Sequence, residues 1–268
     1  MLSAVYGVFT VFAVGVLLPS VATAATYHSL SFGEVVRLAD VVVTGTVVKA
    51  EAQFTDPVFQ FRADEVLSGT VAQGSILAIH RYQLRTAYNR GTHKVGDTMA
   101  LFLSNKAPRR DIGWPAGSFA VLRGSAEGEL PIIAGRVMIT GAELELRDHP
   151  TTQVMFGGQP LKAHVVDAAS FAPAIRMYPE VRRSLLHDLK AEHPHSAEEA
   201  VQATKRIAAN GHWEAHLKAS GVNKALFWSV ASECQQAFRA WENAKQMPTW
   251  MAEDVQEFLA QCLRMKKP

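Results

Sequence analysis

Two histidines and an acid lie close together in the segment Gly211-His-Trp-Glu-Ala-His216. Histidines four residues apart share one face of a helix and form a zinc-ligand pair in hydrolases, where a glutamate directly after the first histidine is the general base. Here Glu214 follows His212 by two residues, so on a helix it is turned about 200° away from that histidine. A helical segment would therefore lack the general base of that mechanism.

A zinc site would require a third ligand beside His212 and His216. The available candidates are His187, His193 and His195. Because a spacing of four is common by chance, the competing interpretation is a pair of partly exposed helix histidines, and His193-Pro-His195 is typical of a solvated loop. A zinc-dependent hydrolase using His212 and His216 is kept as an alternative hypothesis, and no cofactor is expected.

Other catalytic arrangements are missing from the sequence. Gly117-Ser118 lacks the second glycine of a nucleophile elbow, and no glycine-rich phosphate loop occurs. Cys234 and Cys262 both fall on apolar stripes, where a thiolate would be costly. These absences favour a non-catalytic protein, with a binding or a structural role in the cell envelope.

Basic and aromatic residues gather between Val66 and Trp114, in segments that link predicted strands. From Val66 to Arg110 there are seven basic residues and one acid, Asp97. Aromatic rings beside Arg and Lys suit sugars, anionic polymers or the acidic surface of a protein partner. The alternative is a solvated basic face with its rings folded under the rest of the protein. The predicted ligand-binding residues are Arg81, Tyr82, Arg85, Tyr88, Arg90, Lys94, Arg109, Arg110 and Trp114.

The N-terminus resembles a secretory leader. No Asp, Glu, Lys or Arg precedes Glu34, an apolar run extends from Val5 to Leu18, and Ala22-Thr-Ala24 matches a signal-peptidase site. Cleavage after Ala24 would leave 268 − 24 = 244 residues with the same formal charge of +2. The alternative is a retained membrane anchor. We expect export to a periplasm or the exterior, no membrane span after leader removal, and no nucleic-acid partner, since the pI of about 8.5 is low for one.

The elements that must position these residues change character along the chain. After a short helix near 31–38, β-rich segments at 41–49, 59–63, 75–79, 98–103 and 118–122 predict a barrel or sandwich. Three more segments, near 130–133, 136–140 and 143–146, predict appended hairpins. The barrel domain is expected over 25–150 and a linker over 151–169.

A helical domain is expected over 170–268. Pro179 is predicted in a first turn, Ser196 with Glu199 forms a capping box, and Asn223 is predicted to cap a longer helix. A last helix from Thr249 would pair with it as a hairpin. Cys234 and Cys262 would then meet across that hairpin, which favours a disulfide over two buried thiols.

Three runs resemble strands of netrin-like domains, the OB-type barrels that include tissue inhibitors of metalloproteinases. They are Phe32 to Val47, Phe61 to Gly69 and Gly96 to Leu103. The resemblance spans about residues 32 to 123 and implies an OB-type antiparallel barrel in an α+β protein. It implies no metalloproteinase inhibition, because the chain has no cysteine before Cys234 and the family's inhibitors use an N-terminal one.

Overall fold

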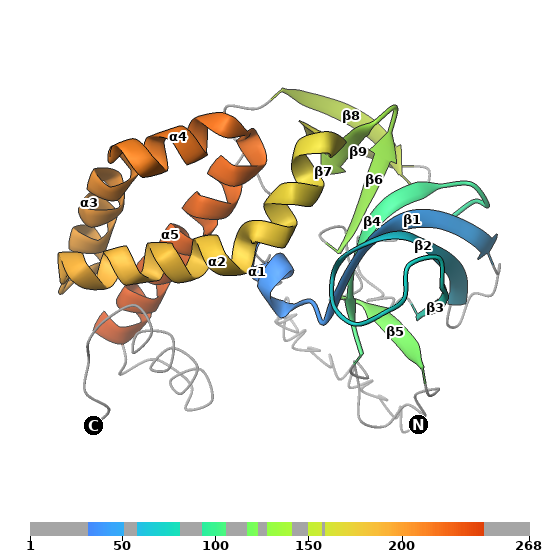
Figure 1. Cartoon of the computed structure of the whole chain (residues 1–268), viewed down its shortest axis with the longest axis horizontal. Coiled ribbons are helices and arrows are strands. Elements are labelled where there is room, and N and C mark those ends of the chain that lie inside the picture. Colours follow the sequence, from blue (N-terminus) through green and yellow to red (C-terminus); the bar gives the residue numbers. More distant parts are fainter. Residues whose placement is uncertain are drawn as a thin grey trace, which may run out of the picture.

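The computed structural model describes residues 32–50, 58–80, 93–105, 117–122, 128–140, 150–156 and 159–243. Within these ranges a strand-rich half is followed by helices (Figure 1). The helix α1 (Phe32–Leu38) lies between the two halves and leads into the first strand. This arrangement confirms the α+β class that the change of periodicity predicted.

The first five strands close into a barrel. Neighbouring strands pair in the order β1, β2, β3, β5, β4, and β4 pairs again with β1. All of these pairs are antiparallel except β3 with β5, which run parallel. The OB-type barrel is confirmed, with this parallel pair as the departure from the all-antiparallel barrel that we expected. The strands are β1 (Val41–Ala50), β2 (Val58–Ser68), β3 (Ile76–His80), β4 (Thr98–Ser104) and β5 (Ser118–Val121).

Strands β1 and β4 are buried on both faces. Val43 and Leu101 pack inside the barrel, whereas their neighbours Val42 and Phe102 pack on the outside against the helices. Successive side chains of a strand point to opposite faces, so both faces need apolar residues here. The continuous β-branched run at the start of β1 follows from this double burial.

Four further strands extend the sheet beyond the barrel. Strand β6 pairs with the first half of β4 and β5 with its end, so the two share one edge of that strand. The predicted strands near 130–133 and 136–140 are present, and the one near 143–146 lies outside the described residues. The added strands, in their order across the sheet, are β6 (Glu129–Ile133), β7 (Arg136–Ile139), β9 (Gln159–Asp167) and β8 (Thr151–Phe156).

The segment 151–169 is not the linker that we expected. It contains the hairpin of β8 and β9 and the start of the next helix. The register pairs Phe156 with Gln159, so the sequence places only Gly157 and Gly158 between the strands. A Gly-Gly pair between two strand-forming runs is a hairpin signal, which was available in the sequence.

We expected Pro179 to lie in the first turn of this helix. Helix α2 (Ala168–Glu192) instead begins well before that residue. Asp167 is its N-cap and accepts the N–H of Ala169 at 3.2 Å. Pro173 and Pro179 both lie inside the helix, and α2 changes direction along its length in Figure 1. Proline removes a helical hydrogen bond and clashes with the preceding turn, which accounts for such a bend.

Three more helices complete the described chain: α3 (Ala197–Ala208), α4 (Gly211–Ala219) and α5 (Gly221–Glu242). The predicted cap of α3 is confirmed, because the Ser196 hydroxyl accepts the N–H of Glu199 at 3.1 Å. Helix α5 is capped by Ser220 rather than Asn223. The Ser220 hydroxyl accepts the Asn223 N–H at 3.1 Å, so Asn223 lies in the first turn. The predicted last helix from Thr249 lies outside the described residues.

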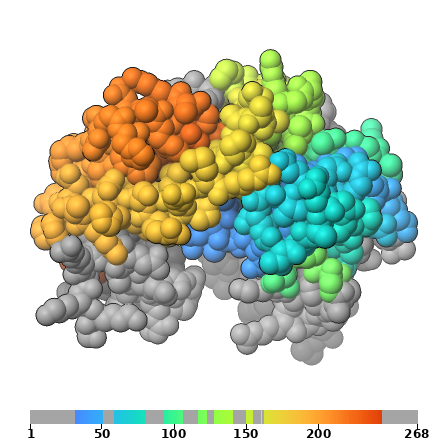
Figure 2. Space-filling view, in the orientation of Figure 1, coloured from blue at the N-terminus to red at the C-terminus, as the bar shows by residue number. Residues whose placement is uncertain are grey.

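The helices and the outer face of the sheet share one apolar core. Phe102 of β4 lies in the same buried cluster as Phe171 of α2 and Phe227 of α5, and Phe32 of α1 contacts both Phe102 and Phe171. Figure 2 shows α2 (yellow) lying against β2 (cyan) on one side of the molecule. The barrel interior forms a separate cluster. The helices are therefore packed on the barrel rather than tethered beside it.

Candidate functional site

The two basic and aromatic segments leave the barrel from neighbouring points. Ala120 of β5 pairs with His80, the last residue of β3, and also with Ser104, the last residue of β4. Adjacent strands are about 4.8 Å apart, so the two exits are separated by roughly 10 Å, with β5 between them. Strand β3 runs parallel to β5 and β4 antiparallel to it, so the chain continues from the two exits in opposite directions. The segments that begin at residues 81 and 106 thus start on either side of one short strand.

Most of the predicted contact surface lies outside the described residues. Lys94 is described; it is exposed, in the turn that leads into β4. The Asp97 carboxylate accepts the Lys94 backbone N–H at 2.7 Å, and Gly96 between them has a φ of +96°, a left-handed conformation that glycine adopts without strain. The remaining predicted residues, outside the described ranges, are Arg81, Tyr82, Arg85, Tyr88, Arg90, Arg109, Arg110 and Trp114.

The base of the second segment is fixed to the residue that precedes β1. The Asp40 carboxylate accepts the Ser104 hydroxyl and the Asn105 backbone N–H, both at 3.0 Å. The Asp40 N–H in turn donates to the Leu103 carbonyl at 2.8 Å. Chain leaving the barrel after Asn105 therefore starts from an anchored position.

A buried contact between a histidine and a glutamate, which the sequence did not predict, lies where the first segment returns. His93 Nε2 is 3.3 Å from Glu129 Oε2, and the side chains are 4% and 1% exposed. The His93 ring also contacts Phe59 edge to face, with centroids 4.7 Å apart. Glu129 opens an otherwise apolar strand, Glu129-Leu-Pro-Ile-Ile133, and that isolated acid was the available signal.

The segment from Gly211 to His216 is helical and lies in α4. Trp213 is 2% exposed and its ring contacts both histidines, with ring centroids 5.5 Å from His212 and 5.7 Å from His216. Glu214 pairs with Lys218 at 2.6 Å, which lowers the pKa of Glu214. This glutamate therefore does not stand beside the histidines in the position that the general base of a zinc protease requires.

The electrostatic setting of His216 is that of a neutral imidazole. Burial, and then the proximity of His212, lower the pKa of His216 below its usual value. Its Nε2 is buried and has no hydrogen-bond partner among the residues that the structure describes. Desolvation disfavours the charged form of a histidine, so this ring is neutral at pH 7.

Among the described residues, the candidate histidines do not bring a third metal ligand to this pair. His187 is exposed on α2, 3.4 Å from Asp188, while His193 caps the end of α2 and His195 lies in the following turn, both exposed. Over the described ranges no group of three His, Cys, Asp or Glu side chains is placed to hold a metal ion. Within these ranges the zinc alternative has two of the three protein ligands that a catalytic site needs.

Comparison with protein-family models and with curated proteins gives no match to this chain. The resemblance to netrin-like domains accordingly stays a prediction. Among the helices of the described residues, none is both long enough and apolar enough to span a membrane.

Proposed function

We propose that the protein is an exported, non-catalytic binding protein. Its partner would be anionic, either a polymer of the cell envelope or the acidic surface of another protein. The contact surface would consist of the basic and aromatic residues of segments 81–94 and 109–114. No cofactor is required for this function.

The observation that carries the proposal is the double pairing of Ala120 with His80 and Ser104. It supports neighbouring starting points for the two segments, which begin about 10 Å apart on either side of β5 and, because β3 and β4 run antiparallel to each other, continue from there in opposite directions. Loops on a rigid barrel commonly hold its ligand, and OB-type barrels bind oligosaccharides and oligonucleotides in this way. Arg and Lys would supply charge to that surface, and tyrosine and tryptophan rings would stack on sugars or cover apolar groups.

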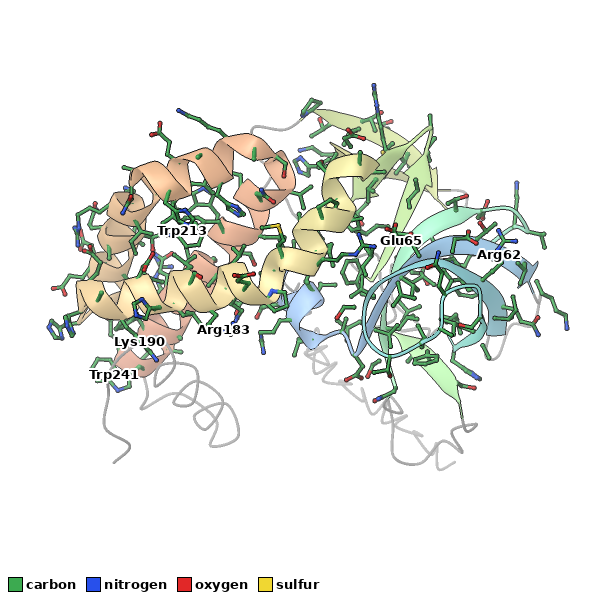
Figure 3. The ribbon with its side chains drawn as sticks, in the orientation of Figure 1. Arg62, Glu65, Arg183, Lys190, Trp213 and Trp241 are labelled. Carbon is green, nitrogen blue, oxygen red and sulfur yellow. The ribbon has the colours of Figure 1, made fainter. Side chains whose placement is uncertain are left out.

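A charge-reversal experiment tests this surface. The double variant Arg85→Glu with Arg90→Glu should lower the affinity for polygalacturonate, a carboxylated sugar polymer, by at least about tenfold. The matched control is Arg183→Glu with Lys190→Glu, which makes the same change of net charge on α2, on the helical half of the molecule (Figure 3). The control should retain wild-type affinity.

Two results would contradict the proposal. Equal losses in both double variants would mean that only net charge matters. A wild-type protein that binds polygalacturonate no better than neutral dextran would remove the anionic-polymer form of the proposal, and a parallel test with an acidic protein would then decide the other form.

Export and the disulfide belong to the same proposal. Cys234 is buried in α5, and Cys262 lies outside the described residues. Intact mass of the secreted protein should correspond to a chain that starts at Ala25. Alkylation without prior reduction should add no mass, because both sulfurs would be in the disulfide, and addition of one or two labels would contradict it.

A further inference from the structure

A buried carboxylate lies where α1, α2 and α5 meet. The Glu233 side chain on α5 is 5% exposed, and its Oε2 is 3.5 Å from Arg37 Nε on α1 and 3.9 Å from Arg182 Nη2 on α2. Within the described residues, neither carboxylate oxygen accepts a hydrogen bond. Ion pairs at these distances compensate only part of the cost of burying a charge.

The surroundings of Glu233 are packed too tightly to rearrange easily. The Gly33 N–H on α1 donates to the Ser229 hydroxyl on α5 at 2.9 Å. A Cβ at Gly33 would collide with that hydroxyl and lie 2.8 Å from the Tyr178 hydroxyl oxygen of α2. Tyr178 is 2% exposed, and its hydroxyl has no hydrogen-bond partner in the described part of the chain. The contact of α1 with the other helices is therefore close and rich in buried polar groups.

The charges that face Glu233 come from α1 and α2. Burial is the largest influence and raises the pKa of Glu233 from the usual 4.5 to about 7, against the lowering effects of Arg37 and Arg182. Glu34 on α1 raises this pKa further. Burial and the negative charge of Glu233 also raise the pKa of Tyr178, which stays neutral. The balance favours an uncharged carboxyl, although two arginines lie nearby.

We infer that Glu233 makes the contact of α1 with α2 and α5 a proton-sensitive joint, which is tight when the carboxyl is protonated and weaker when it is ionised. Helix α1 continues through Ala39 and Asp40 into β1, so the joint connects the barrel to the helices. Protonation thus adjusts how firmly the two halves hold together. The inference is independent of the proposed binding function.

The direction of the pH effect follows from the raised pKa. Between about pH 4.5 and 7 the folded protein holds a proton on Glu233 that the unfolded chain has released. The added stability is therefore complete below about pH 4.5 and is lost as the pH rises through 7. Each pH unit between the two pKa values changes the unfolding equilibrium constant about tenfold, so the interval from 4.5 to about 7 corresponds to an effect of about 300-fold.

Urea unfolding of the full mature chain between pH 4.5 and 8.5 tests the joint. Glu233→Gln resembles the protonated carboxyl, so its unfolding equilibrium constant should fall relative to that of the wild type by up to about 300-fold as the pH rises. Glu65→Gln is the control, because Glu65 also connects the two halves, through an exposed 2.6 Å pair with Arg176 of α2. This control should keep the wild-type pH profile. Parallel profiles for the wild type and Glu233→Gln would overturn the inference.

A measurement on the wild-type protein covers the case in which Glu233→Gln does not fold. In protein labelled with ¹³C at glutamate carboxyls, the Glu233 resonance should titrate near pH 7. Hydrogen exchange should show that the loss of stability is located at α1. The Ala39 amide donates to the Val35 carbonyl at 3.2 Å, and its protection against exchange should fall between about pH 6 and 8. A full set of glutamates titrating below about pH 5.5, or α1 protection that does not change, would overturn it.

Discussion

The Ser104 hydroxyl donates a hydrogen bond to the Asp40 carboxylate at 3.0 Å, across 64 positions of sequence. Asp40 immediately precedes β1, and Ser104 is the last residue of β4, so this bond ties the entry of one barrel strand to the exit of its neighbour. The same carboxylate oxygen accepts the Asn105 N–H. One side chain therefore organises the rim from which the second basic segment departs.

Asp40→Ala should lower the free energy of unfolding by about 1–3 kcal/mol, because a partly buried hydroxyl and a backbone N–H lose a charged acceptor. Urea unfolding measures the loss. Asp40→Asn keeps one acceptor oxygen and should lose about half as much. A change below about 0.5 kcal/mol in Asp40→Ala would mean that water replaces the carboxylate without cost.

Gly33→Ala should destabilise the contact between α1 and α5. The new methyl group would collide with the Ser229 hydroxyl, and overpacking of a core typically costs about 1–3 kcal/mol. Gly211→Ala at the start of α4 is the control, since no atom lies within 4 Å of the added carbon. The control should unfold within about 0.5 kcal/mol of the wild type. Equal stability of the two variants would contradict the packing of α1 described above.

The sequence predicted the barrel strands well because their periodicity and their turns agreed. The segments near Val41 and Thr98 are mostly β-branched or apolar, and both became doubly buried strands. Prediction failed where a local signal competes with tertiary packing. Pro179 on its own favours a helix start, but the packing of α2 accommodates the proline inside the helix.

The buried ionisable groups could not be found from the sequence in the same way. Glu233 precedes Cys234 on the apolar stripe of α5, and its partners Arg37 and Arg182 come from two other helices. Only the fold brings these three residues together. The basic and aromatic segments, in contrast, were evident from composition. The register of β5 shows in addition that their starting points lie close together.

Trp213→Phe should cost about 1–2 kcal/mol of unfolding free energy. The Trp213 indole donates to the Asp188 carboxylate of α2 at 2.7 Å, and this bond joins α4 to α2. A hydrogen bond to a charged acceptor contributes more to stability than one to a neutral acceptor. Because the Asp188 side chain is partly exposed, solvent screening reduces that contribution here.

A matched control for this variant is Trp241→Phe on α5. Its ring is 42% exposed, so the change should alter stability by less than about 0.5 kcal/mol. In an Asp188→Ala background the Trp213→Phe cost should shrink. An undiminished cost would show that packing alone is responsible.

Metal analysis of the mature protein, secreted without a histidine tag, should find well below one zinc per chain. Because the pKa of His216 is lowered, its ring is already neutral at pH 7, so protonation would not be the reason for weak binding. The reason would be geometric, since His212 and His216 supply two imidazoles and the exposed His187 is 3.4 Å from Asp188 instead of joining them.

The opposite result would be equally informative. About one zinc per chain, lost in His216→Ala and retained in His187→Ala, would mean that a ligand outside the described residues completes the site. Hydrolase assays would then replace the polygalacturonate experiment as the test of function. Because Glu214 is paired with Lys218 on α4, any general base would also have to come from elsewhere in the chain.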